Sequence, residues 1–334
     1  MTATVAAWTS LAPGPIWPNG GPVPGDDVVG MTVAAFLAAE LGPLGVRTDG
    51  AHVGAAGVPG PTVGIGAIGT TAPHAVGSPM LARAVTAAGL TLGTARPFAD
   101  PDALVADPGW TLGVVLSPWK RDVAARLGRL SPSAATTGVV DTVLRPPAAW
   151  APGAPAGTQP SGAGPIGVNT NSWAAQAVLE LLAAGRVPAS IVLLGAGASA
   201  RSVALAVRRV WPVARLLVSA RSTAGAAELA GLAGADAVAP VDLADALAGR
   251  PPTILINSTT WGETPESEAH PFPFPTELLL GPGGAFFDLN NRLSELQGRA
   301  LAAGATVSSG TLMQRATHAS RAAAVRAVLT QENP

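Results

Sequence analysis

The chain has 334 residues and a formal net charge of −1, and 48% of its residues are hydrophobic. This length allows two domains with buried cores, and the balanced charge gives no electrostatic basis for a nucleic acid or an anionic membrane as partner. The lack of cysteine excludes disulfides and thiolate metal sites. Since neither a signal peptide nor an apolar run of membrane-spanning length is visible, we expect a cytoplasmic protein.

The first half of the chain alternates between predicted strands and helices. Residues 1–60 form an N-terminal extension that contains one predicted amphipathic helix, and residues 61–166 read as an α/β domain. We expect helices at 31–41, 80–90, 101–107 and 121–127, and strands at 63–68, 96–99, 111–116 and 138–144. A loop at 69–79 separates the first strand from the next helix, and a Pro-, Ala- and Gly-rich linker covers 145–165.

Lys120 is the only lysine, and every other basic residue apart from histidine is arginine. The abundance of Ala, Gly and Pro is typical of a GC-rich coding sequence, in which arginine replaces lysine wherever charge alone matters. A retained lysine is therefore a candidate for proton transfer, which the permanently charged arginine cannot perform. Composition alone leaves a solvated surface lysine as an equal interpretation.

A dinucleotide-binding motif begins the second half of the chain. A helix is expected at 172–184, and a buried strand at 191–195 then runs into Gly195, Gly197 and Ala200, which give the pattern G-x-G-x-x-A. The first glycine allows a sharp turn, the second lets the backbone approach a pyrophosphate, and Ala200 lets the helix pack close to the strand. The helix N-terminus presents free N–H groups to the phosphates. Further strands are expected at 215–219, 253–256, 285–289 and 306–307, and helices at 292–303 and 312–329.

The end of the second predicted strand of this domain indicates the form of the cofactor. In this architecture the strand tip meets the adenosine ribose, where a carboxylate would accept from a free 2′-hydroxyl. Here Arg221, Ser222 and Thr223 follow the strand, and the first carboxylate is Glu228. A guanidinium and two hydroxyls suit a 2′-phosphate, so we predict NADP(H) rather than NAD(H).

Together these pieces resemble the shikimate dehydrogenase family, over roughly residue 63 to the C-terminus. The motifs GIGAIG, SPWK, DTV, GVNTN, GAGASAR, SARST, NSTTWG, FFDLN and SSGTLMQ occur in the order of that family. The resemblance implies an α/β fold of two domains. The substrate-binding domain would comprise 61–166 with the returning final helix at 311–334, the Rossmann-like NADP-binding domain would comprise 167–310, and the active site would lie between them.

The resemblance also implies roles for individual residues. Lys120 looks like the catalytic lysine of the family, while Asp141 and Asn171 stand where the family has an asparagine and an aspartate, respectively. Our hypothesis is that Asp141 partners the lysine and that Asn171 is the neutral hydrogen-bonding group. Substrate contacts are expected from His74, Ser78, Trp119, Asn291 and Gln314. Cofactor contacts are expected from Gly195, Gly197, Ala198, Ser199, Ala200, Arg221, Ser222, Thr223, Asn257, Ser258, Thr259 and Gly310.

Several departures from the family pattern favour an altered substrate. One serine of the substrate loop is missing, Leu116 replaces a threonine, and the chain contains no tyrosine. We therefore expect an NADP(H)-dependent oxidoreductase of a shikimate-like cyclic hydroxy, amino or imino acid, in specialised metabolism. Open alternatives are an ordinary shikimate or quinate dehydrogenase, a non-catalytic NADP-binding regulator, and a folate-type dehydrogenase. The four histidines are scattered along the sequence, so no metal site is expected. The sequence leaves open whether the chain forms a homodimer.

Overall fold

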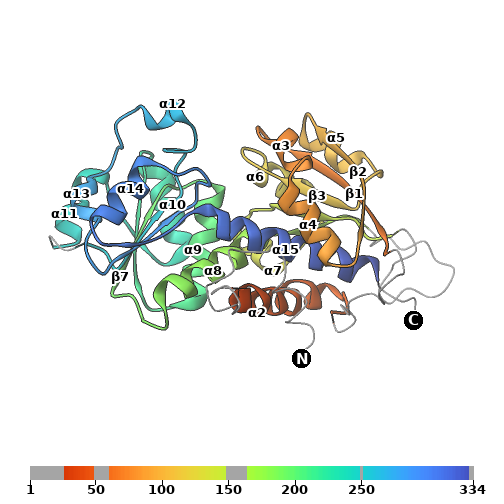
Figure 1. The fold of residues 1–334 in the computed structure, drawn as a ribbon, viewed down its shortest axis with the longest axis horizontal. Helices are drawn as coiled ribbons and strands as arrows, with labels where there is room; N and C mark the ends of the chain where they lie inside the picture. Colours follow the sequence, from red (N-terminus) through yellow and green to blue (C-terminus); the bar gives the residue numbers. More distant parts are fainter. Residues whose placement is uncertain (1–25, 49–59, 148–163, 249–250, 331–334) are drawn as a thin grey trace, which may run out of the picture. The chain divides into compact units, whose positions relative to one another are not determined.

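The computed structural model describes residues 26–48, 60–147, 164–248 and 251–330 (Figure 1). The rest of the N-terminal extension and most of the predicted linker lie outside these residues. The chain divides into two compact units: unit 1 comprises Met1–Ala174 with Arg315–Pro334, and unit 2 comprises Ala175–Gln314. Within the described ranges, no helix combines the length and apolar character needed to cross a bilayer.

Unit 1 is built on a mixed six-stranded sheet in the order β2-β1-β3-β5-β6-β4. The strands are β1 (Thr62–Ile68), β2 (Thr91–Phe98), β3 (Leu112–Val115), β4 (Arg129–Leu130), β5 (Thr142–Leu144) and β6 (Ile166–Val168). Strand β5 runs antiparallel to both of its neighbours, and the remaining pairs are parallel. The helical segments before α8 are α2 (Asp26–Phe36), η1 (Leu37–Leu41), η2 (Gly42–Leu44), α3 (Ala72–Val76), α4 (Pro79–Ala87), α5 (Pro101–Ala106), α6 (Lys120–Arg126) and α7 (Pro132–Thr137).

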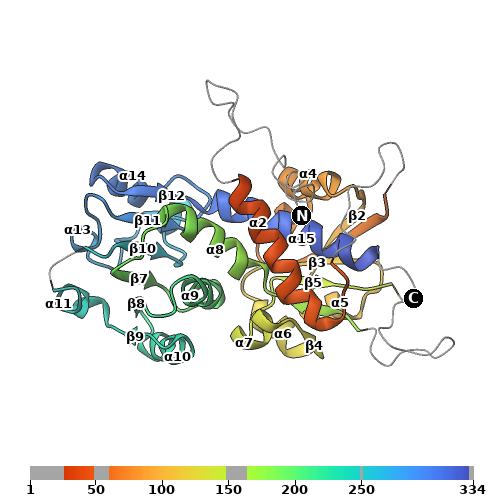
Figure 2. The same cartoon turned by 90° about the horizontal axis from the view of Figure 1, so that it is seen from below.

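Unit 2 is a parallel six-stranded sheet flanked by helices, as Figure 2 shows. Its strands are β7 (Ser190–Leu194), β8 (Arg215–Ser219), β9 (Asp236–Ala237), β10 (Ile254–Asn257), β11 (Ala285–Asp288) and β12 (Thr306–Ser308). The helical segments between these strands are α9 (Ala198–Val210), α10 (Thr223–Ala233), η3 (Pro240–Asp242), α11 (Leu243–Ala246), α12 (Pro265–Glu268), α13 (Thr276–Leu279) and α14 (Glu295–Ala302).

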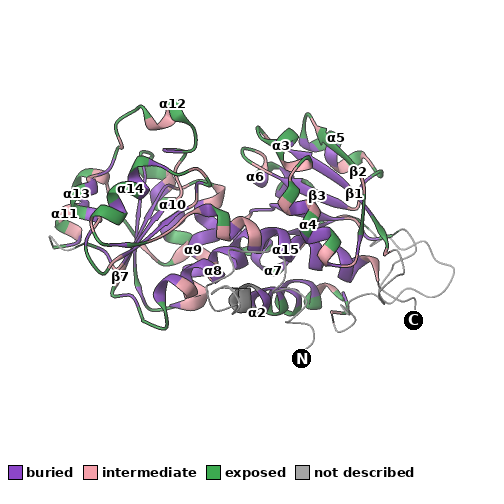
Figure 3. Ribbon diagram, viewed as in Figure 1, coloured by how far each residue is buried: buried purple, intermediate pink, exposed green. Residues whose placement is uncertain are grey.

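The strand order of unit 2 is that of a Rossmann fold. The sheet runs β12-β11-β10-β7-β8-β9, so the chain order reverses between β7 and β10. Ligands of such sheets bind outside the carboxyl ends of the strands at this switch point. The central strands are apolar on both faces because helices cover both sides, and Figure 3 shows them as buried.

Two helices belong to both units. Helix α8 (Thr170–Ala183) starts in unit 1, and α15 (Gly310–Leu329) starts in unit 2 and continues in unit 1. The domain limits expected from the sequence, at 166 and 311, fall in β6 and in the first turn of α15. The units instead divide within the helices, because the first turn of α8 is hydrogen-bonded to Asp141 of unit 1.

Some elements differ from their predicted bounds. Strand β2 starts at Thr91 rather than 96. The sequence did not reveal its first residues, because β2 is an exposed edge strand without the alternation that marks a half-buried one. His74 lies in the short helix α3 rather than in a loop. Helix α14 begins at Glu295 rather than 292, because the Ser294 hydroxyl caps it by accepting from the Gln297 N–H at 3.3 Å.

Candidate functional site

The glycine turn lies at the carboxyl end of β7, as predicted. Gly195 has φ of +105°, and a Cβ there would lie 2.8 Å from the Ser258 carbonyl oxygen. Its N–H donates to the Ser219 carbonyl at 2.8 Å. Only glycine fits this position, because both the backbone angle and the neighbouring chain exclude a side chain.

Gly197 is different, because nothing stands where its side chain would be. It precedes α9 with φ of −77°, and a Cβ would meet no atom within 4 Å. Ala198 and Ser199 follow in the first turn of α9, whereas Ala200 is fully buried against the sheet. The turn therefore leaves open space at a helix N-terminus, which is what a pyrophosphate needs.

Two buried hydroxyls flank this turn without a hydrogen-bond partner. The Oγ atoms of Ser219, at the end of β8, and Ser258, just after β10, are buried and make no hydrogen bond to any described residue. Buried polar groups are normally hydrogen-bonded, so a polar ligand at the switch point would supply the missing hydrogen-bond partner of both hydroxyls. The residues present therefore fit a dinucleotide.

The tip of β8 carries the predicted 2′-phosphate contacts. Arg221, Ser222 and Thr223 are exposed, and the Ser222 hydroxyl caps α10 by accepting from the Gly225 N–H at 3.1 Å. The nearest following carboxylate, Glu228, forms an ion pair with Arg201 of α9. The acidic group that could serve a free ribose hydroxyl is thus already paired with a protein cation.

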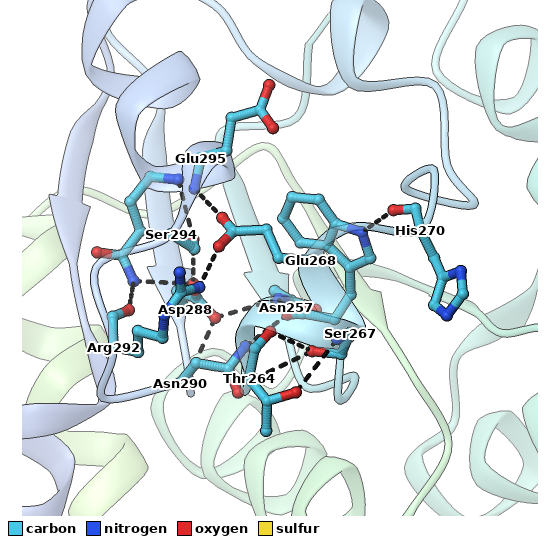
Figure 4. Close-up of polar contacts among 12 residues, drawn as sticks. Asn257, Thr264, Ser267, Glu268, His270, Asp288, Asn290, Arg292, Ser294 and Glu295 are labelled. Atoms are coloured by element: carbon cyan, nitrogen blue, oxygen red, sulfur yellow. Dashed lines mark hydrogen bonds and ion pairs between the residues drawn. The ribbon is translucent and has the colours of Figure 1, made fainter.

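Asn257 and Thr259 shape the loop after β10. The Asn257 side-chain oxygen accepts from the Thr259 N–H at 3.1 Å and from the Thr259 hydroxyl at 2.6 Å. Its amide nitrogen donates to Asp288 Oδ1 at 3.1 Å. Figure 4 shows how Asn290 and Ser294 join the same network around Asp288. Burial raises the pKa of Asp288 against the effect of its hydrogen bonds.

The remaining predicted residues of unit 2 lie near the start of α15. Gly310 is buried, and a Cβ there would lie only 2.0 Å from the Leu289 carbonyl oxygen, so its role is close backbone packing. Asn291 is exposed on the turn after β11, and Gln314 is half-buried on α15.

In unit 1 the only lysine is buried. Lys120 is the first residue of α6 and is 6% exposed, which removes the interpretation as a solvated surface residue. Its carbonyl accepts from the Val140 N–H at 3.0 Å. Because Val140 directly precedes Asp141, the fold brings the backbones of Lys120 and Asp141 to one place.

Asp141 is fully buried and caps helix α8. Its Oδ1 accepts from the Thr170 N–H at 3.0 Å and from the hydroxyls of Thr170 at 2.7 Å and Thr142 at 2.8 Å. Its Oδ2 accepts from the Asn171 N–H at 2.6 Å. An anion at a helix N-terminus is favoured both by the dipole and by the free N–H groups. The carboxylate at position 141 therefore stabilises the first turn of α8, in addition to any role in the chemistry.

Asn171 stands in the same first turn, 9% exposed. Its side-chain oxygen accepts from the hydroxyl of Thr317 on α15 at 3.2 Å. Asp141 thus lies against the first turn of α8, and the backbone of Lys120, at the start of α6, lies next to Val140, the residue that precedes Asp141. Of the other residues expected to contact substrate, Ser78 caps α4 by accepting from the Leu81 N–H at 3.3 Å, Trp119 precedes α6 half-buried, and His74 is exposed.

On the polar face of α15 that lies against this cluster, sequence reasoning missed Thr317 and Arg321, and it considered His318 only as an alternative to Gln314. Thr317, His318 and Arg321 are all buried, at 5%, 3% and 4% exposure. Burial and the charge of Arg321 lower the pKa of His318 to about 3. Polar residues at positions i, i+1 and i+4 of an alanine-rich helix were the available signal. Among the described residues, no group of His, Asp or Glu side chains is arranged to hold a metal ion.

The strand orders and the glycine turn define a two-domain α/β protein with a Rossmann-type unit. No family model matches the sequence, and no curated protein matches it either. Solved structures do match. Shikimate 5-dehydrogenase from Thermus thermophilus, in complex with NADP(H) and shikimate, is 26% identical with a TM-score of 0.60, over 77% of this chain and 90% of that one.

Two further matches show the same fold. Quinate dehydrogenase from Corynebacterium glutamicum, in complex with NAD, is 22% identical with a TM-score of 0.62, over 80% of this chain and 94% of the other. Shikimate dehydrogenase from Aquifex aeolicus is 23% identical with a TM-score of 0.61, over 76% and 88%. The resemblance drawn from the motifs is confirmed: the chain is similar to solved shikimate and quinate dehydrogenases and shares their two-domain fold.

Proposed function

We propose that this chain is an NADP(H)-dependent oxidoreductase that acts on a shikimate-like cyclic hydroxy, amino or imino acid, with Lys120 as the acid and base. The observation that carries the proposal is the burial of the only lysine beside a buried carboxylate. Lys120 is 6% exposed, and its carbonyl is hydrogen-bonded to the residue that precedes Asp141. Buried ionisable groups on neighbouring backbone segments are candidates for a catalytic site.

The bound cofactor would supply or accept the hydride, which is chemistry that no side chain of the protein offers. The residues of this chain would bind the cofactor and the substrate, orient them, and supply the proton. Lys120 would pass a proton to the substrate oxygen or nitrogen as that atom gains charge, and would take it back in the reverse direction. Asp141 would keep the Lys120 side chain in position, and Asn171 would form a hydrogen bond with the substrate.

The glycine turn supports cofactor binding. Open space at Gly197, the helix N-terminus at the start of α9 and the unpartnered hydroxyls of Ser219 and Ser258 together suit a dinucleotide. NADP(H) is preferred over NAD(H) because Arg221 stands at the tip of β8, while Glu228 is paired with Arg201. The solved relatives use both forms, since one complex contains NADP(H) and another NAD.

The test is a panel assay. Purified protein is titrated with NADPH and NADH, and NADP⁺ reduction is then followed with shikimate, quinate and their amino analogues. We expect tighter binding of NADPH and turnover of at least one acid, with an analogue faster than shikimate. Fastest turnover of shikimate or quinate would identify an ordinary dehydrogenase. NADPH binding without turnover of any acid would favour a regulatory protein and contradict the proposal.

A further inference from the structure

Arg321 on α15 is a buried cation that the proposed chemistry does not use. Its Nε–H donates to Thr142 Oγ1 at 2.9 Å, and a terminal N–H donates to the Asp141 carbonyl at 3.0 Å. Because a guanidinium cannot accept, the Thr142 oxygen must accept from it, which leaves the Thr142 proton to donate to Asp141 Oδ1 at 2.8 Å. The guanidinium therefore reaches the carboxylate through one hydroxyl.

The charges of Arg321 and Asp141 compensate each other. Both residues are buried, and a buried charge is costly unless it is paired and hydrogen-bonded. Burial lowers the pKa of Arg321, and the nearby Asp141 charge opposes that change. The neighbouring His318 has a pKa of about 3 and contributes no positive charge near neutral pH.

We propose that Arg321 is a positioning residue that fixes Asp141 through Thr142 and determines that position 141, rather than 171, carries the carboxylate. The inference rests on the proposed function only in so far as Asp141 serves Lys120. Helix α15 places a different group beside each of the positions 141 and 171. It presents a cation to Asp141, which favours a carboxylate there, and the neutral Thr317 hydroxyl to Asn171, which suits an amide.

The first test is an unfolding cycle that needs no substrate. Arg321→Gln removes the buried cation that reaches Asp141 through Thr142, and Asp141→Asn removes the carboxylate that compensates the buried guanidinium. If the two charges compensate, each single variant lowers the denaturant midpoint, and the double variant lowers it by much less than the sum of the two. Additive midpoint shifts would overturn the inference.

The second test separates positioning from stability. With the best acid of the panel, Arg321→Gln should lower kcat about 100-fold through misplacement of Asp141, with KM and the NADPH Kd nearly unchanged. Arg321→Lys should restore part of the loss. The matched control is Arg326→Gln, because Arg326 is a buried arginine of the same helix that donates to the Ala88 carbonyl. It should lower the unfolding midpoint but leave kcat unchanged.

Thr142→Val provides a second variant if Arg321→Gln does not fold. It removes the hydroxyl that relays between the two charges and keeps both charges. We expect a similar loss of kcat, and an unchanged kcat would overturn the relay. If the wild type turns over no acid while the unfolding cycle is non-additive, the proposed function fails and the pairing of Arg321 with Asp141 stands.

Discussion

Asp141 combines a structural and a proposed chemical task in one side chain. Its two oxygens hold the first turn of α8, so replacement by alanine would damage the helix as well as the chemistry. Asp141→Asn is the better variant, because it keeps the shape and one acceptor oxygen. We expect kcat to fall by about 10² to 10⁴, the range that general acid–base groups contribute. Asp102→Asn, which removes an exposed carboxylate paired with Arg126, is the control and should leave kcat unchanged.

Gly197 allows cofactor binding to be separated from stability. Asparagine is a preferred helix N-cap and fits φ of −77°, so Gly197→Asn should not lower the unfolding midpoint. Its side chain would fill the open space, and we expect the NADPH Kd to rise at least tenfold. Gly231→Ala, at an equally open position within α10, should stabilise by about 0.5 to 1 kcal/mol and leave the Kd unchanged. Unchanged NADPH affinity in Gly197→Asn would place the cofactor elsewhere.

At the scale of elements, the N-terminal helices are part of unit 1. The buried Glu40 of η1 accepts from the Trp173 indole N–H at 2.8 Å and from the Ser133 N–H at 3.0 Å, and it also accepts from the Ser133 hydroxyl. The Trp173 ring meets Phe36 edge-on, with 6.4 Å between ring centroids. Glu40 thus ties η1 to the starts of α7 and α8.

Glu40→Gln should therefore destabilise the protein. An amide cannot accept from all three donors, and each buried donor left unmade costs about 1 to 3 kcal/mol. We expect a loss of about 2 kcal/mol or more in the free energy of unfolding, measured with urea. The exposed Glu263→Gln should change it by less than about 0.5 kcal/mol. A stability equal to that of the wild type would mean that Glu40 does not hold η1 in place.

The elements that the sequence predicted well are those whose burial leaves a pattern. Strands β7, β8, β10 and β11 are apolar because both of their faces are covered, and their bounds agree with the prediction to within about a residue. The edge strand β2 was mostly missed, and so was α10, which has small residues on every side. Exposed or alanine-rich elements carry little periodicity, so tertiary contacts determine where they lie.

The residues of the candidate site also differ in whether a local sequence pattern marks them. The glycine turn and Lys120 were visible because a motif or a composition bias marks them. The partners of Asp141 were not visible, because Thr142, Thr170 and Arg321 meet only when β5, α8 and α15 pack together. Long-range contacts of this kind leave no local spacing in the sequence. The family resemblance marked position 141 but not the residues that hold it.

For the whole molecule, the buried His318 links stability to pH. Its pKa is lowered from 6.5 to about 3 in the folded protein, so the unfolded chain binds more protons between these values. Stability is therefore lost as the pH falls through this window, by at most about 1.4 kcal/mol per pH unit for one group. His318→Gln should show a shallower loss between pH 6.5 and about pH 4. Identical pH dependence in urea unfolding of both proteins would contradict a neutral, buried His318.

The central claim is that this shikimate dehydrogenase-like chain uses its only lysine for proton transfer. The most direct measurement compares wild type and Lys120→Met in two readouts on the same samples, NADPH affinity and turnover of the best acid of the panel. We predict an NADPH Kd within about twofold and a kcat lowered by about 10² to 10⁴. A kcat close to that of the wild type in Lys120→Met would contradict the account.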